Sequence, residues 1–385
     1  MHLQRKQNEM TPLQTSRTAA RSTGLFDRTD GPLAAWLRNV AQCQSGQHAG
    51  AIAGCVSVSG TPSYVYPEIA GYYLTWLAWR AARSGHDADD AERARAVQRW
   101  LAQWLAMPSL PTRVHFDGTS GDWRNHALFC FDIAMVLRGL AAAGRAGLLA
   151  PDPAVVEGMC GALFRVVGSD GMFEACVPSG SSGAIPERWS TRRGPFLAKA
   201  ASGVLRAATV LRIPAPLQAA AEQTFAACVA HLAREPHRET HPLLYAFEGV
   251  LDMPQHPRFH DALPSVAAQF DMLLAYATHD AHLPESLCRA SGSGPARIDV
   301  MAQTLRVGYL LAAHRPQQPP DRVGLARLRQ SLARHVRPGS GVGFARSVAP
   351  AQANVWATMF ADQALAFATP SRDSDAWWRH DPLIV

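Results

Sequence analysis

Apolar residues along this chain recur with the spacing of amphipathic helices, in twelve separate segments. Strand-like alternation is scarce, and the stretches between segments are rich in Gly, Pro and Ser. The segments span residues 32–44, 66–84, 88–107, 124–146, 152–168, 193–212, 215–235, 241–253, 258–278, 297–314, 321–336 and 350–369. The pattern therefore predicts an all-helical protein.

The even-numbered segments differ in character from the odd-numbered ones. Residues 128–131 and 198–210, in even segments, are apolar on nearly every side, which is typical of a buried helix. Odd segments carry the surface charge, as 88–107 does. Alternating buried and half-buried helices in six units predict an inner and an outer ring, that is, an (α/α)6 toroid of six helical hairpins.

The inner helices are expected to start near residues 66, 125, 194, 241, 296 and 352 and to point the same way. Four of these starts have Pro in or just before the first turn. Long connections precede several of them, so the loops gather at one end of the ring, where functional sites usually lie. Helix N-termini at that end favour anionic ligands.

Bulk properties restrict the class of protein. One toroid domain is expected over residues 30–385, after a disordered polar tail at 1–29 that lacks the apolar core of a signal peptide. No run of about 18 apolar residues predicts a membrane span. The net charge of +6 includes no basic block, which argues against nucleic-acid binding. Seven cysteines without a C-x-x-C pair favour a reducing, cytoplasmic location. The oligomeric state stays open.

Each predicted inner helix interrupts its apolar pattern with polar residues about one turn apart. Because buried polar groups are costly unless paired, such stripes either pair between helices or line a polar cavity, and six of them favour the cavity. The residues expected to line it are Glu68, Tyr72, Asn125, Asp132, Arg193, Lys199, His241, Tyr245, Glu248, Arg297, Asp299, Gln303 and Trp356. Trp123 and Trp189, in loops before two inner helices, are expected to stack on sugar rings.

Five inner-helix segments resemble toroid proteins found among bacterial polysaccharide and surface-glycan biosynthesis genes. They are 66–73 (YPEIAGYY), 131–140 (FDIAMVLRGL), 194–200 (GPFLAKA), 241–249 (HPLLYAFEG) and 297–303 (RIDVMAQ). The resemblance covers about residues 60–370. Glucuronyl C5-epimerase toroids, alginate and heparin lyases and six-hairpin glycosidases are similar more distantly, in architecture. The resemblance implies carbohydrate chemistry in the funnel, on a bacterial glycan or glycan precursor.

The leading hypothesis is proton transfer beside a uronate carboxylate, giving epimerisation or β-elimination. Tyr245 with His241 would move the proton, and a nearby cation would neutralise the carboxylate. Arg193, Lys199 and Arg297 are the candidates for that cation. A tyrosine base needs cationic neighbours that lower its pKa.

Two other readings remain. Two carboxylates among Glu68, Asp132, Glu248 and Asp299 would flank a glycosidic bond in a hydrolase. A non-catalytic glycan-binding or assembly protein would need only aromatic and hydrogen-bonding groups. No metal is expected, since no Cys stands beside a His at an inner-helix start, and no cofactor is expected either.

Overall fold

The computed structural model describes residues 31–118, 122–180, 183–234, 239–277, 283, 285–287, 297–345, 352–368 and 384–385. The predicted tail at 1–29 lies outside these residues. The even-numbered helices are α2 (Pro67–Ser84), α4 (Cys130–Arg145), α6 (Leu197–Ala208), α8 (Thr240–Leu251), α10 (Ile298–His314) and α12 (Val355–Phe367). The odd-numbered ones are α1 (Pro32–Val40), α3 (Ala88–Leu105), α5 (Pro153–Phe164), α7 (Ala215–Arg234), α9 (Phe259–Ala275) and α11 (Arg322–Ala333).

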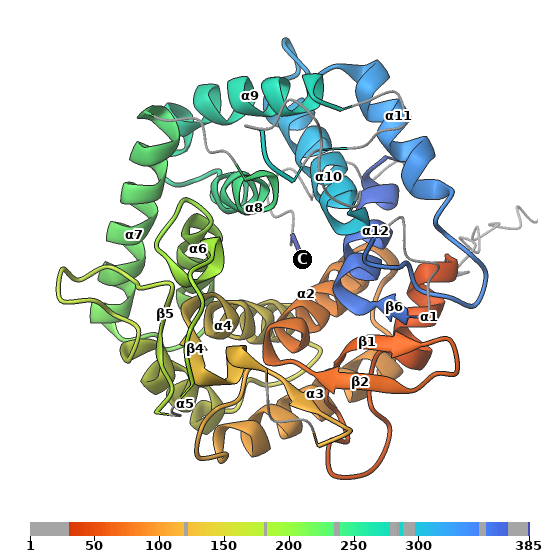
Figure 1. Cartoon of the computed structure of the whole chain (residues 1–385), viewed down its shortest axis with the longest axis vertical. Helices are drawn as coiled ribbons and strands as arrows, with labels where there is room; N and C mark the ends of the chain where they lie inside the picture. Colours follow the sequence, from red (N-terminus) through yellow and green to blue (C-terminus); the bar gives the residue numbers. More distant parts are fainter. Residues whose placement is uncertain are drawn as a thin grey trace, which may run out of the picture.

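The even-numbered helices form a closed inner ring. Each contacts the next, and α12 contacts α2, while the odd-numbered helices pack around the outside (Figure 1). This arrangement confirms the predicted (α/α)6 toroid.

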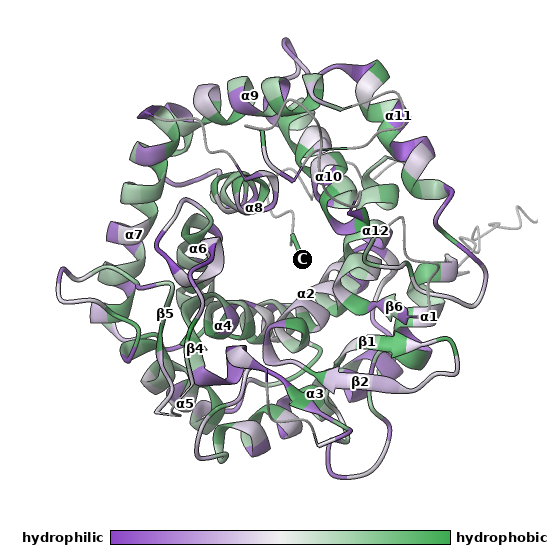
Figure 2. Ribbon diagram, viewed as in Figure 1, coloured by the Kyte–Doolittle hydropathy of each residue, from purple (hydrophilic) through white to green (hydrophobic). Residues whose placement is uncertain are grey.

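Burial follows the predicted division between the rings. Every residue of α8 is buried, whereas α3 buries one face, which includes Val97 and Leu101. Figure 2 shows strongly hydrophilic patches on the outer helices and loops, and mostly apolar colours on the inner helices. Within the described part of the chain, no helix combines the length and the apolar character needed to cross a membrane.

Glycines let α2 and α4 approach each other closely. A methyl group on Gly71 would collide with the main chain of Met135, and one on Gly139 would collide with the main chain of Gly71. Only glycine allows two backbones to pack at this distance. The close contact brings together the first turns of the two helices, which carry Glu68 and Asp132.

Short strands lie along one part of the ring, beside α12, α2, α4 and α6 (Figure 1). One sheet has the order β3-β2-β1-β6, from β1 (Ala53–Ser57), β2 (Pro62–Val65), β3 (Val114–His115) and β6 (Gln352–Asn354); a second pairs β4 (Ala127–Phe129) with β5 (Cys176–Pro178). Three predicted helix starts are therefore wrong. The chain after residue 125 pairs as β4 with β5 before α4 begins at Cys130, and α6 begins at Leu197, after a turn at 194–196. Residues 352–354 form β6, and α12 begins only at Val355.

Residues Ile384 and Val385 fill the axis of the ring (Figure 1). The main-chain oxygen of Val385 accepts hydrogen bonds from Lys199 Nζ at 2.9 Å and from Arg306 Nη1 at 3.0 Å. Its N–H donates to Gln363 Oε1 at 3.2 Å. Arg138 of α4 also donates to the main-chain oxygen of Ile384. Four inner helices thus hold this segment, which no periodic pattern in the sequence predicts.

Candidate active site

A pocket of about 560 Å³ opens at the N-terminal ends of the inner helices. Each inner helix contributes a residue from its first turns or its N-cap: Glu68, Asp132, Phe196, Tyr245, Arg297 and Trp356. The six helices therefore run in one direction, as predicted, and their N-termini surround the pocket.

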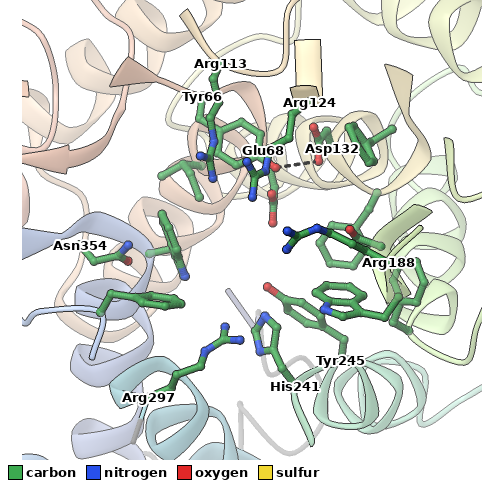
Figure 3. Close-up of a pocket in the computed structure, with 18 of the residues that line it drawn as sticks. Tyr66, Glu68, Arg113, Arg124, Asp132, Arg188, His241, Tyr245, Arg297 and Asn354 are labelled. Carbon is green, nitrogen blue, oxygen red and sulfur yellow. Dashed lines mark hydrogen bonds between the residues drawn. The ribbon is translucent and has the colours of Figure 1, made fainter. Parts of the chain in front are cut away.

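Two carboxylates, Glu68 on α2 and Asp132 on α4, lie near each other in the pocket wall (Figure 3). The hydroxyl of Tyr66 donates a hydrogen bond to Asp132 Oδ1 at 3.1 Å. Burial raises the pKa of both carboxyls, and the charge of Glu68 raises that of Asp132 further, well above its usual value. The pair can therefore keep a shared proton to a higher pH than two separate exposed carboxyls would, and the rise in pKa is larger at Asp132.

His241, in the first turn of α8, lies across the pocket from this pair (Figure 3). Its Nδ1 is 2.6 Å from Oε1 of Gln303 on α10. Because an amide oxygen only accepts, Nδ1 carries the hydrogen and Nε2 keeps a lone pair. Burial, and then the charge of Arg297, lower the pKa of His241 to about 3, so the ring is neutral at physiological pH.

Aromatic side chains build one wall of the pocket. The ring of Trp189 packs edge-on against Phe196 and His241, with centroids 5.2 and 5.6 Å apart. Tyr245 packs against His241 at 4.4 Å and against Phe131 at 4.8 Å. Aromatic surface with a few polar groups is typical of a small-molecule site.

Glu248, one turn further along α8 than Tyr245, lies below the pocket. Its carboxylate is 2.8 Å from Lys199 Nζ and also pairs with the guanidinium of Arg306. Gln303 donates to it at 3.3 Å. All these polar side chains are fully buried. The prediction that Glu248, Lys199 and Gln303 line the cavity is therefore wrong, because they pair with one another between inner helices.

Asp299, also predicted to be catalytic, is fully buried behind the pocket. Arg297 bonds its carboxylate through Nε at 3.1 Å and Nη2 at 2.6 Å, and Trp356 Nε1 lies 3.4 Å from Oδ2. Burial alone would raise the pKa of Asp299, but Arg297, together with His241 and the N–H of Val300, outweighs burial and holds the pKa below its usual value. Asp299 therefore stays ionised and positions Arg297 and Trp356, which do line the pocket.

Arg193 and Asn125 were expected in the cavity but do not line it. The Arg193 guanidinium turns outward and lies 2.8 Å from Asp170 and 2.7 Å from Glu174. Asn125 exchanges two hydrogen bonds, both of 2.8 Å, with the main chain of Arg113. The first residue therefore stabilises a loop by ion pairs, and the second fixes the segment that contains β3.

The Tyr245 hydroxyl points into the pocket (Figure 3), but its pKa is not lowered. Lys199 lies 4.8 Å from the centroid of the ring. Burial, and then the charges of Glu68 and other carboxylates, nevertheless raise the pKa of Tyr245 well above its usual value. The prediction that Tyr245 acts as a base with a lowered pKa is therefore wrong. Tyr72, also expected in the cavity, is buried beneath it, with its hydroxyl 3.3 Å from that of Tyr245.

Replacing Tyr245 by Phe is accordingly expected to lower kcat by less than about tenfold, since the hydroxyl supplies a hydrogen bond and no proton transfer. The measurement is kcat on a substrate of the parent protein, with the melting temperature recorded in parallel. A loss of about a hundredfold at unchanged stability would return tyrosine to the mechanism.

Three arginines line the pocket that were not among the predicted site residues, Arg113, Arg124 and Arg188. The last two directly neighbour Trp123 and Trp189 in the sequence, and that adjacency was the available signal. Arg113 has no such signal, because the pairing of β3 with β2 brings it to the pocket. Among the described residues, no group of three or more His, Cys, Asp or Glu side chains is placed to hold a metal ion.

Neither a protein-family model nor a curated protein sequence matches this chain. The cellobiose 2-epimerase of Spirochaeta thermophila is similar in structure, with a TM-score of 0.64 and 15% identity over 87% of this chain and 93% of that one. A D-mannose isomerase has a TM-score of 0.65 and 13% identity, over 88% and 96% of the two chains. An unsaturated glucuronyl hydrolase specific for heparin has a TM-score of 0.60 and 12% identity, over 87% of this chain and 94% of that one. These identities show a shared fold alone; the relation to polysaccharide biosynthesis stays a prediction.

Proposed function

We propose that this chain is a carbohydrate-active enzyme that hydrolyses a glycosidic bond, with Asp132 as general acid and Glu68 as base or nucleophile. The observation that carries the proposal is this buried pair of carboxyls with raised pKa values at the pocket wall. Asp132 gives its proton to the leaving oxygen, while Glu68 attacks the anomeric carbon or removes a proton from water. A raised pKa keeps an acid protonated at neutral pH.

Other features of the site support a sugar substrate. Trp123, Trp189 and Trp356 offer aromatic surface beside the polar groups. The structures that share this fold include the glucuronyl hydrolase and a glycosidase in wild-type and variant forms, and these supply the analogy for carbohydrate as the substrate class.

A second candidate is proton transfer at a sugar carbon, as in an epimerase or a lyase, with His241 as the base. The specific observation in its favour is the neutral imidazole whose Nδ1 is bonded to Gln303, which leaves Nε2 with a lone pair. Sugar epimerases and an isomerase share the fold. A pKa of about 3 makes His241 a weak base, which is why hydrolysis is the preferred reaction.

Mass spectrometry of oligosaccharides incubated with the protein in D2O separates the reactions. Hydrolysis shortens the chain and adds one water, with no new carbon–deuterium bond. Epimerisation keeps the length and introduces deuterium at carbon, and β-elimination leaves an unsaturated sugar without added water. We expect the hydrolytic products, from uronate-containing substrates first.

Deuterium bound to carbon in a substrate that stays uncut would rule out hydrolysis as the main reaction and favour proton transfer by His241. Saturable binding of a glycan that stays unchanged under all conditions would favour the binding-protein reading instead. The experiment uses a panel of neutral and acidic oligosaccharides. Heat-denatured protein, tested in parallel with the parent protein, is the control for spontaneous cleavage.

A further inference from the structure

Three arginines that line the pocket have carboxylate partners. Arg113 and Arg124 both pair with Asp122, at 3.3 and 3.0 Å. Arg297 pairs with Asp299 at 2.6 Å. Arg297 donates to Asp299 through both Nε and Nη2, whereas Arg113 and Arg124 each use one Nη1 on Asp122. Each of these guanidinium groups already has a carboxylate beside it, which weakens its attraction for an additional anion.

Arg188 differs, because no carboxylate of the residues that the structure describes pairs with its guanidinium. Its main chain is fixed by a 2.9 Å hydrogen bond from its N–H to Thr191 Oγ1. Its guanidinium carbon lies 5.6 Å from the ring centroid of Trp123 and points into the pocket (Figure 3). Arg188 is therefore an exposed cation whose main chain is anchored and whose guanidinium lies near an aromatic ring, with its donors toward the pocket.

We propose that Arg188, braced by Trp123, binds the carboxylate of a uronic acid residue in the substrate. The proposal rests on the proposed action on sugars and names their class. A planar guanidinium presents two parallel N–H donors at the spacing of the two carboxylate oxygens. A neutral hexose offers only hydroxyls, which a guanidinium binds less strongly than an anion.

A carboxylate fits better than a sulfate or a phosphate. Those groups present three oxygens in a tetrahedral arrangement and are usually held by clusters of cations or of main-chain N–H groups. Arg188 supplies one pair of parallel N–H donors. Arg124, which lies over the same Trp123 ring, already donates to Asp122 through Nη1. One pair of parallel donors matches the two oxygens of one carboxylate.

Isothermal titration calorimetry with D-glucuronate and D-glucose tests the proposal, since the two sugars differ only at carbon 6. The parent is expected to bind glucuronate more tightly than glucose, and Arg188→Met to lose about ten- to a hundredfold in glucuronate affinity while glucose binding changes little. Arg192→Met is the matched control. Arg192 is on the same loop and pairs with Glu187 at 2.7 Å, but it does not line the pocket.

Equal affinity of the parent for the two sugars, or an unchanged preference in Arg188→Met, would overturn the proposal. Tighter binding of glucose 6-sulfate or glucose 6-phosphate than of glucuronate would overturn the choice of carboxylate. Arg188→Lys keeps the charge but loses the two parallel N–H donors. Compared with Arg188→Met, it is expected to recover only part of the affinity for glucuronate. Because binding is measured without turnover, Asp132→Asn should still prefer glucuronate, so a failure of the catalytic proposal is seen separately.

Discussion

Glu248→Gln is expected to lower the free energy of unfolding by about 3–5 kcal/mol, the usual result of removing one partner from a buried ion pair. Lys199 and Arg306 share this carboxylate, and all three side chains are fully buried. Without it, two cations lie close together where water does not solvate them. The oxygen of Val385 accepts from both cations and remains in the variant. A typical domain is stable by about 5–15 kcal/mol, so the expected loss is a large part of the total.

The difference in the free energy of unfolding between the parent and Glu248→Gln is expected to shrink as the pH rises. Burial lowers the pKa of Lys199 to about 8, and Glu248 partly opposes that shift. The unfolded chain, in which a lysine titrates near its usual value of about 10.4, then binds more protons than the folded chain between the two pKa values. Stability due to Lys199 therefore rises with pH in that interval. Without Glu248 the folded pKa is lower still, so the rise begins at a lower pH than in the parent.

Glu92→Gln is the matched control for this variant. Glu92 forms ion pairs with Arg95 and Arg99, at 3.0 and 2.8 Å, on the surface of α3. Solvent and salt screen such pairs, so the control is expected to unfold like the parent. Denaturant unfolding followed by circular dichroism compares the three proteins. Equal midpoints for Glu248→Gln and the parent would contradict the proposed role of the buried network.

The sequence predicts the two rings because burial leaves a periodic trace. A helix buried on all sides must be mostly apolar on all sides, as α8 is, and an outer helix must have one polar face. The same periodicity places Glu68 near the N-terminus of α2, and so at the mouth of the ring. What it does not predict is the local pairing of 127–129 with 176–178, since three residues are too few for a strand pattern.

The sequence also leaves the depth of each polar residue undetermined. Tyr245 and Glu248 share one face of α8, yet the first lines the pocket and the second lies beneath it, among cations from α6 and α10. Helical spacing gives the face of a residue, and only packing against neighbouring helices decides where a cavity ends. The same limit applies to Arg193 and Arg188, whose directions depend on loop conformations that distant residues stabilise.

The largest effects on activity are expected for Asp132→Asn and Glu68→Gln. Each variant should lose about a hundredfold or more in kcat, the size of a general acid–base contribution. The parent rate should fall as the pH rises through the upper apparent pKa of the pair, when Asp132 loses its proton. It should also fall as the pH drops through the lower one, when Glu68 gains a proton. In each variant the remaining carboxyl titrates alone, so one limb of the profile should disappear.

Stability separates a catalytic role from a structural one. Since the pKa of Asp132 is raised in the folded state, the folded chain binds the proton more tightly than the unfolded chain. The stability that this group contributes is therefore lost as the pH rises from the unfolded pKa toward the folded one. Asparagine is neutral at every pH, so at neutral pH Asp132→Asn is expected to be at least as stable as the parent while it loses activity.

Asp170→Asn makes the same chemical change outside the pocket, at an exposed carboxylate 2.8 Å from Arg193, and is expected to leave kcat unchanged. All variants are compared by kcat, pH–rate profile and melting temperature on one substrate. Parent-like kcat in both Asp132→Asn and Glu68→Gln, together with a large loss in His241→Asn, would transfer the chemistry to the imidazole. The two carboxyls would then serve to bind the sugar, and the deuterium experiment should show exchange at carbon.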